Sequence, residues 1–368
     1  MTELEQLITE SRIIVCCGTG GVGKTTTSAA LALKAARMGK RALVVTIDPA
    51  KRLATSLGME EIPDEPLDLT SHLPEKVKGR FSAVVPNSER TFARLVRTLA
   101  RGDDSAMGRV FKTSIYKIFT KEFSGAHEYM AMEKLHELSQ LLDKGELDLI
   151  VQDTPPSANT TLFLEAPHRM ASFFDETVMR WFTAPAGKWL AGGVEKALGM
   201  LEKLTGHGFL TDLMEFARAL FALRAQFVEN LAHISNLLRR ADTRFVMVTT
   251  SERLARPDTQ GFVQGLHRDG YSFWGFLVNR VLASRLGLKR GALQENPAWA
   301  QELQGTVDEK TVAALRSGFR GLQPRLEQET DAELFLQGLD PRFHVAEIPE
   351  QDNDVHSIEA LHALSQSY

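Results

Sequence analysis

Residues 18–25 read Gly18-Thr19-Gly20-Gly21-Val22-Gly23-Lys24-Thr25, and this stretch decides the fold of the 368-residue chain. It fits the pattern G-x-x-x-x-G-K-[ST] and lies between an apolar run, Ile13 to Cys17, and a helix-like segment, Thr26 to Arg37. A strand, a glycine-rich turn and a helix in this order are the context in which the pattern holds phosphate groups. The sequence therefore predicts a loop that binds a nucleoside triphosphate.

The residue types of the loop explain this prediction. Glycines let successive backbone N–H groups curl round phosphate oxygens at the positive end of the following helix. Lys24 is a mobile positive charge that can reach the β and γ phosphates. The Thr25 hydroxyl is placed to coordinate the Mg²⁺ ion that bridges those phosphates. The alternative is a glycine-rich turn that binds nothing.

The bulk composition is that of an ordinary globular protein, with 43% apolar and 24% charged residues. The net charge of -4 gives no basic field, so binding to nucleic acid or to an anionic membrane is not favoured. Met1 to Ser11 is polar and acidic, unlike a signal peptide, and no apolar stretch is long enough for stable membrane insertion, so we expect a cytoplasmic protein. The two cysteines, Cys16 and Cys17, are expected in the core, which excludes a disulfide framework.

Two further apolar runs end in carboxylates. Arg41 to Asp48 reads as a buried strand ending in Asp48, and Leu147 to Asp153 as another ending in Asp153. Ligands bind at the carboxyl edge of a parallel sheet, so both side chains should lie near the glycine-rich loop. Asp153 is expected to hold Mg²⁺ through water and to sense the γ phosphate. For either residue the alternative is a carboxylate that only caps a turn or helix.

The remaining pattern predicts an α/β fold with a doubly wound, mainly parallel sheet in a single domain, 1–368. Helical patterns over 103–145 and 159–240 interrupt the sheet and predict a helical subdomain, in which Thr211 to Arg240 reads as one helix. The stretch 286–339 is polar and helical and reads as a solvated insertion. Four more runs read as strands: Thr243 to Thr250 and Phe273 to Arg280 as buried strands, and Phe81 to Val85 and Phe343 to Ile348 as short ones.

With these pieces placed, the chain resembles the ArsA family of ATPases, which includes the arsenite-pump ATPases and the ATPases that target tail-anchored proteins. The resemblance covers nearly the whole length. Five segments in a specific order carry it: Gly20-Gly21-Val22-Gly23-Lys24-Thr25-Thr26 in the loop, Thr46-Ile47-Asp48-Pro49-Ala50 as switch I, Asp153-Thr154-Pro155-Pro156-Ser157 as switch II, Val278-Asn279-Arg280, and Ile348-Pro349.

The resemblance implies a dimer that closes around two ATP·Mg²⁺. It implies that Asp48 orients the attacking water, beside Lys24 as the second catalytic residue, and that Glu252 and Asn279 contact the nucleotide, Asn279 at the adenine. The segment 103–240 corresponds to the part that forms a hydrophobic client groove in targeting members, opened and closed by the nucleotide state. A hydrophobic or protein client is therefore expected.

Three departures limit what carries over. The family's loop usually has a lysine that reaches the partner's phosphates, and here Thr19 stands at that position. Either another basic residue such as Lys51 or Arg52 supplies the charge, or the chain forms a heterodimer with a paralogous subunit instead of a homodimer, or hydrolysis is slow. The zinc-binding Cys-x-x-Cys of targeting members and the arsenite-binding cysteines of pump members are both absent. Arsenite transport is disfavoured, since a soft metalloid needs thiolates.

Other classes of protein remain as alternatives. A positioning ATPase of the kind that partitions chromosomes or places the septum (ParA/MinD-like) shares the loop but needs a basic surface or a basic membrane helix, and the segment His356 to Tyr368 contains no Lys or Arg. A nucleotide-sensing scaffold that hydrolyses slowly fits Thr19. Phosphoryl transfer to a small molecule is weaker, because no acceptor site is apparent.

Overall fold

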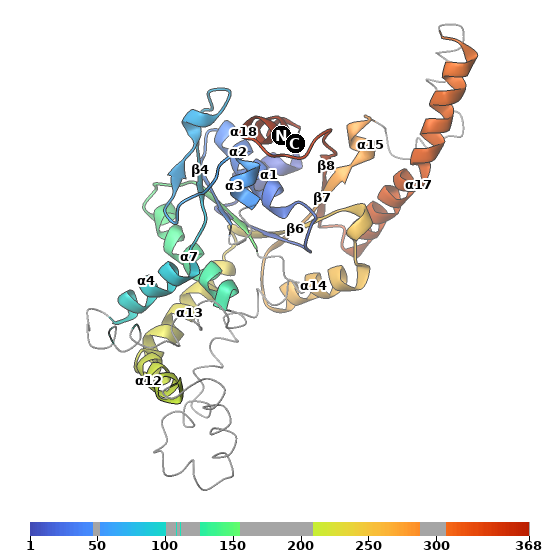
Figure 1. Ribbon diagram of the computed structural model, residues 1–368. Coiled ribbons are helices and arrows are strands. Elements are labelled where there is room, and N and C mark those ends of the chain that lie inside the picture. Colours follow the sequence, from blue (N-terminus) through green and yellow to red (C-terminus); the bar gives the residue numbers. More distant parts are fainter. Residues whose placement is uncertain are drawn as a thin grey trace.

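The computed structural model describes residues 1–46, 52–100, 108, 111, 126–154, 209–287 and 307–367. Within them, eight strands form one sheet in the order β3-β4-β2-β5-β1-β6-β7-β8 (Figure 1). Every neighbouring pair is parallel except β3 and β4, so the predicted doubly wound, mainly parallel α/β sheet is confirmed. The strands are β1 (Ile13–Cys17), β2 (Arg41–Thr46), β3 (Leu67–Asp68), β4 (Arg80–Val84), β5 (Leu149–Asp153), β6 (Thr243–Thr249), β7 (Phe273–Val281) and β8 (His344–Pro349).

Strand β1 shows why the sequence reads as a continuous apolar run. Its five side chains are all buried, because alternate residues face two separate apolar layers. Cys16 and Cys17 are in the core as expected, and burial raises the pKa of Cys16 to about 12. One layer contains α1 (Glu3–Glu10), α2 (Lys24–Arg37), α3 (Arg52–Ser56) and α18 (Ile358–Gln366); the other contains α4 (Ser88–Ala100), α7 (Ala126–Asp143), α12 (Phe209–Ala222), α13 (Arg224–Leu238) and α14 (Arg256–Arg268).

The prediction of one helix over Thr211 to Arg240 is wrong, because the chain forms two helices, α12 and α13, with Leu223 between them. Leu223 is buried in the same apolar layer as Phe227, so the hydrophobic stripe runs through the break. Periodicity therefore gives no signal for the single non-helical residue. Within the predicted helical segments, 103–107, 109–110, 112–125 and 159–208 lie outside the described residues. The described parts, α7 and α13, pack through stacked rings of Tyr129 and Phe227.

The prediction of a solvated insertion over 286–339 is also wrong in part. After the short helix α15 (Leu282–Arg285), residues Glu309–Leu339 form the 31-residue helix α17, which contains Pro324. The first half projects away from the sheet (Figure 1). The second half buries Leu326, Ala332 and Leu336, and it packs on α15 and β8. Its charged residues suggested a solvated helix, but two of them, Glu329 and Glu333, are buried.

A buried polar cluster joins α7 to α13. The Asn230 side-chain amide donates to Glu133 Oε2 at 2.5 Å, and the Tyr129 hydroxyl donates to the same oxygen at 3.3 Å. Burial raises the pKa of Glu133 to about 7. The two hydrogen bonds lower this pKa in part, and the charge of the nearby Glu137 raises it further. Glu133 is therefore an acid that titrates near neutral pH inside the helical packing.

The stability of the protein should depend on pH through Glu133. The folded-state pKa lies above the ordinary value of 4.5, so the folded state binds the proton more tightly and stability falls as pH rises from about 4.5 to about 7. We expect Glu133→Gln to remove this loss, which amounts to up to about 3 kcal/mol above pH 7. Urea unfolding of both proteins at pH 5 and pH 8 measures it. An unchanged difference between the two pH values in the variant would contradict the assignment.

Candidate functional site

The glycine-rich loop follows β1 and leads directly into α2. Gly18 has φ +145°, and a Cβ there would lie 2.2 Å from the carbonyl oxygen of Val248 in β6. Gly23 has φ +87°, and a Cβ there would lie 2.3 Å from Nδ2 of Asn279. Only glycine combines this backbone with such close approach, so the neighbouring strands dictate these two positions of the pattern.

The amino end of α2 is open to an anion. Gly23 is the N-cap residue, no side chain caps the helix, and its first turn contains no acidic residue. Gly20 and Gly21 are exposed, whereas the Val22 side chain is fully buried and anchors the loop in the core. Backbone N–H groups at a helix amino end, together with the helix dipole, stabilise a phosphate.

Lys24 extends along the loop rather than into solvent. Its side chain is only 6% exposed, and Nζ donates to the Thr19 carbonyl oxygen at 2.9 Å. An ammonium group held over the loop backbone is placed to meet a phosphate that the same loop holds. The next two residues differ in surroundings, because Thr25 is buried whereas Thr26 is half-buried, with its hydroxyl 3.5 Å from that of Ser56.

The end of β5 brings Asp153 beside the loop, as the sequence predicts. Asp153 is 1% exposed, and its Oδ2 accepts hydrogen bonds from the hydroxyls of Thr25 at 2.6 Å and Thr46 at 2.7 Å. The Cα partners of Asp153 are Cys16 in β1 and Thr46 in β2, so three strand ends meet here. Hydroxyl and carboxylate oxygens are ligands suited to Mg²⁺, so Thr25 and Asp153 are the residues here that could hold the ion.

The two switch segments are described only at their beginnings. Thr154 donates from both its N–H group and its hydroxyl to the Cys16 carbonyl, at 3.2 and 2.9 Å, which ties the end of β5 to β1. Residues 47–51, which include Asp48 and Lys51, lie outside the described residues. Strand β2 leads to the same edge of the sheet as Asp153, but the place of Asp48 stays a prediction.

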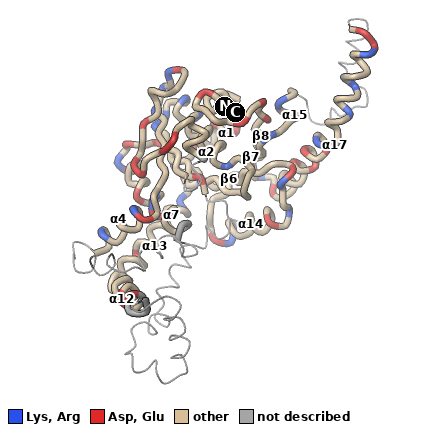
Figure 2. The backbone as a smooth tube through the Cα atoms, viewed as in Figure 1, with Lys and Arg blue, Asp and Glu red and all other residues tan. Residues whose placement is uncertain are grey.

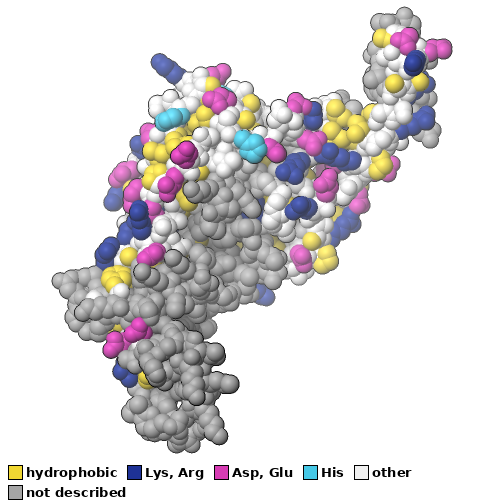
Figure 3. Space-filling model, in the orientation of Figure 1, with side chains coloured by type: hydrophobic (Ala, Val, Ile, Leu, Met, Phe, Trp, Pro, Cys, Tyr) yellow, Lys and Arg dark blue, Asp and Glu magenta, His cyan; other side chains and the backbone are white. Residues whose placement is uncertain are grey.

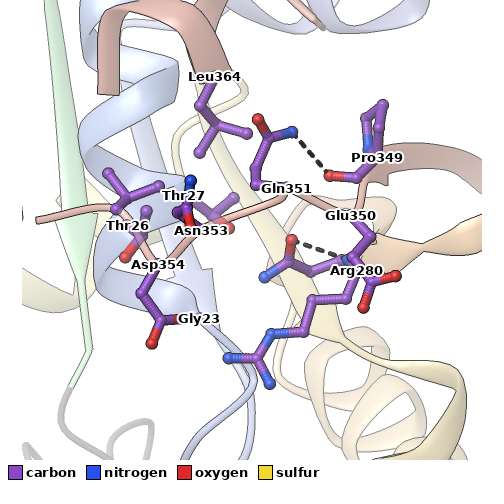
Figure 4. A pocket seen from close by; sticks show the side chains of 12 residues that line it. Gly23, Thr26, Thr27, Arg280, Pro349, Glu350, Gln351, Asn353, Asp354 and Leu364 are labelled. Carbon is purple, nitrogen blue, oxygen red and sulfur yellow. Dashed lines mark hydrogen bonds between the residues drawn. The ribbon is translucent and has the colours of Figure 1, made fainter. Parts of the chain in front are cut away.

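A cavity of about 450 Å³ adjoins the loop. Asn279, at the end of β7, lies between the two, because its Nδ2 donates to the Val22 carbonyl at 2.8 Å. The expected contact of Asn279 with the nucleotide base stays a prediction. The labelled side chains come from α2, from the end of β7 and from the chain after β8 (Figure 4). The cavity is lined by Gly23, Thr26, Thr27, Asn279, Arg280, Pro349, Glu350, Gln351, Asn353, Asp354, Val355 and Leu364.

Helix α17 forms hydrogen bonds to residues that line this cavity. Arg325 donates to the Glu350 carboxylate at 2.9 Å and to the Arg280 carbonyl at 3.1 Å. Glu329, which is buried, accepts the N–H groups of Leu282 and Ala283 at 2.8 and 3.0 Å. The segment expected to be solvated therefore fixes two of the chain segments that line the cavity.

Glu252 lies on η2 (Ser251–Arg253), a short 3₁₀ helix that follows β6. It is exposed and does not line the cavity. The next residue, Arg253, contacts the loop instead: its Nη1 donates to the Gly20 carbonyl at 2.7 Å. Sequence reasoning missed Arg253. Its place at the carboxyl end of a strand beside β1 is the signal that could have found it.

Charges of both signs are interspersed along the described elements, and no large basic area stands out among them (Figure 2). The same mixture of charged and apolar side chains covers the described part of the face in Figure 3. Among the described residues, no helix combines the length and the apolar character that crossing a membrane requires.

The sheet order and the loop define a P-loop nucleoside triphosphatase. A model of the family described as anion-transporting ATPase (ArsA_ATPase) matches residues 11–310, and the chain belongs to this family of ATPases. The resemblance found from the motifs is therefore confirmed.

Relatives of known name carry different assignments. The chain is 25% identical to the "Putative arsenical pump-driving ATPase 1" of Aquifex aeolicus over 86% of this chain and 75% of that protein. It is 23% identical to ATPase asna-1 of Caenorhabditis elegans, over 72% of this chain and 73% of that protein. It is 26% identical to ATPase get3 of Aspergillus terreus, over 75% of each. Membership of the family is thus clear, and of these three names only that of the Aquifex aeolicus protein mentions what it drives, an arsenical pump.

Proposed function

We propose that this protein hydrolyses ATP with Mg²⁺ and couples the nucleotide state to closure of a dimer that binds a hydrophobic or protein client. The observation that carries the proposal is the meeting of Lys24, Thr25 and Asp153 at the open amino end of α2. A cation, a hydroxyl and a carboxylate there supply the three contacts that a triphosphate and its metal need.

Each residue of the site has a separate proposed role. The N–H groups from Gly20 to Thr26 hold the phosphates, and Lys24 compensates their negative charge. Mg²⁺, when bound, neutralises charge on the β and γ phosphates. Thr25 would ligate it, and Asp153 would hold one of its waters while keeping the Thr25 hydroxyl oriented. Asp48 is assigned to orient the attacking water, and Asn279 to contact the base.

Closure around a client is supported by the family and by the helical segment. Apolar surface remains on α13, where Val228 is 45% exposed, and on α12, where Phe221 is half-buried. Such surface suits a hydrophobic ligand whose binding changes with the nucleotide state of the protein. The partner is a second copy of this chain or a paralogous subunit, and the compartment is the cytoplasm. A positioning ATPase is not favoured, because no large basic area that could bind a nucleoid or an anionic membrane stands out along the described elements in Figure 2.

Two measurements test the proposed function. Phosphate release by the purified protein should require Mg²⁺ and stop in EDTA. Light scattering should give a more compact or more stable dimer with a slowly hydrolysed ATP analogue than with ADP. Binding of ATP without phosphate release would indicate a nucleotide-sensing scaffold instead. A single polypeptide that co-purifies in the ATP state and is released with ADP would identify the client.

A further inference from the structure

Two basic side chains rest on neighbouring carbonyl groups of the glycine-rich loop. Lys24 donates to the carbonyl of Thr19, and Arg253 donates to the carbonyl of Gly20 at 2.7 Å. Lys24 belongs to the loop itself, whereas Arg253 reaches it from η2, more than 200 positions later in the sequence. The family pattern of the loop accounts for Lys24 only.

The backbone of Arg253 is held firmly while its guanidinium stays accessible. Its N–H group donates to the Thr250 hydroxyl at 3.2 Å, and α17 fastens η2 because Gln328 donates to the Ser251 carbonyl at 3.2 Å. The side chain is exposed. Its Cζ atom lies 3.2 Å from where a Cβ on Gly21 would stand, so the absence of a side chain at Gly21 makes room for it.

The described residues do not neutralise the charge of Arg253. Among the described residues no carboxylate lies within ion-pairing distance of its guanidinium, and its side chain donates to the neutral Gly20 carbonyl. A guanidinium has five N–H donors in a planar fork that matches phosphate geometry. With respect to the described residues, one carbonyl therefore leaves most of its N–H donors and its charge available beside the loop.

The site needs such a charge. Asp153 is buried beside the loop, and Mg²⁺ offsets only part of the negative charge of a triphosphate. We propose that Arg253 is a phosphate-binding residue, which leaves the Gly20 carbonyl and contacts the terminal phosphate of the nucleotide held in the loop. This inference rests on the proposed function. It assigns to Arg253 the charge that is missing at Thr19, the next residue to Gly20.

A purely structural role makes a different prediction. If Arg253 only holds the loop in place through Gly20, its loss weakens the binding of ATP and of ADP to the same extent. A lysine elsewhere on the loop then does not restore the affinity. If Arg253 contacts the terminal phosphate, its loss weakens the binding of ATP far more than the binding of ADP. A lysine at position 19 then restores the charge from a neighbouring position.

Calorimetric titration with ATPγS·Mg²⁺ and with ADP·Mg²⁺ separates the two roles. Arg253→Ala should raise the dissociation constant for ATPγS by about tenfold or more and that for ADP by less than about threefold. Arg253→Lys should keep most of the affinity. The double variant Arg253→Ala with Thr19→Lys should recover most of the ATPγS affinity. Arg268→Ala, which removes an exposed arginine paired with Asp269 at the end of α14, is the matched control and should change neither constant.

Equal losses for the two nucleotides, no loss, or no rescue by Thr19→Lys would overturn the assignment of Arg253 while leaving nucleotide binding intact. Failure of the wild-type protein to bind either nucleotide would overturn the proposed function itself, and this inference with it.

Discussion

Replacing Lys24 by alanine is expected to weaken the binding of ATP·Mg²⁺ by about a hundredfold or more, because a charged hydrogen bond to phosphate is lost in a sheltered site. The side chain is nearly buried over the loop, so water cannot replace it well. The fold should survive, since the Val22 side chain still anchors the loop in the core. Calorimetric titration of wild type and variant measures the effect.

The matched control for this experiment is Lys144→Ala. Lys144 is an exposed lysine in the turn after α7, so its loss should leave the ATP affinity unchanged. Thermal unfolding of both variants checks that the fold is retained. A Lys24→Ala protein that binds ATP as tightly as the wild type would show that the loop does not hold the phosphates.

The second large effect is expected at Asp48. Asp48→Asn should leave ATP binding within about threefold of the wild type but lower steady-state turnover by roughly a hundredfold or more, because the carboxylate is assigned to the attacking water. An amide of the same shape keeps hydrogen-bonding capacity and loses the charge. Turnover by phosphate release and affinity by calorimetry give the two numbers separately.

Asp68→Asn provides the comparison, because Asp68 lies exposed on the edge strand β3, and the amide oxygen of asparagine can still accept the N–H group of Thr70. This variant should turn over at the wild-type rate. If Asp48→Asn hydrolysed ATP at full speed, Asp48 would lose its catalytic assignment. A parallel loss of affinity and turnover would instead place it among the nucleotide-binding residues.

Thr19 stands where the family's loop usually has a lysine. The sequence leaves three ways to explain the missing lysine, and one of them is another basic residue, with Lys51 and Arg52 as the examples closest to switch I. The side chains of those two residues are not described. The structure adds Arg253, because η2 and the loop meet at the sheet edge although they are far apart in sequence. Slow hydrolysis is then expected for Arg253→Ala rather than for the wild type.

Local patterns in the sequence determined the elements that carry the phosphate chemistry. The apolar runs of β1 and β5, the glycines before Lys24 and the carboxylate that ends β5 are each short-range signals. Parallel strands align their carboxyl ends, so these signals also predicted that Asp153 would lie beside Thr25, as it does at 2.6 Å. The family followed from the order of the same motifs.

Only the tertiary structure decided which residues complete the site. The charge pattern of α17 predicts a solvated helix, yet Arg325 and Glu329 fix the cavity wall. Arg253 reaches Gly20 from another strand, and the break at Leu223 leaves the hydrophobic stripe intact. The physical reason is common to all three. The periodicity of apolar residues indicates which side chains are buried. The partner of a side chain, in contrast, depends on how elements far apart in sequence pack together, and no local pattern encodes that packing.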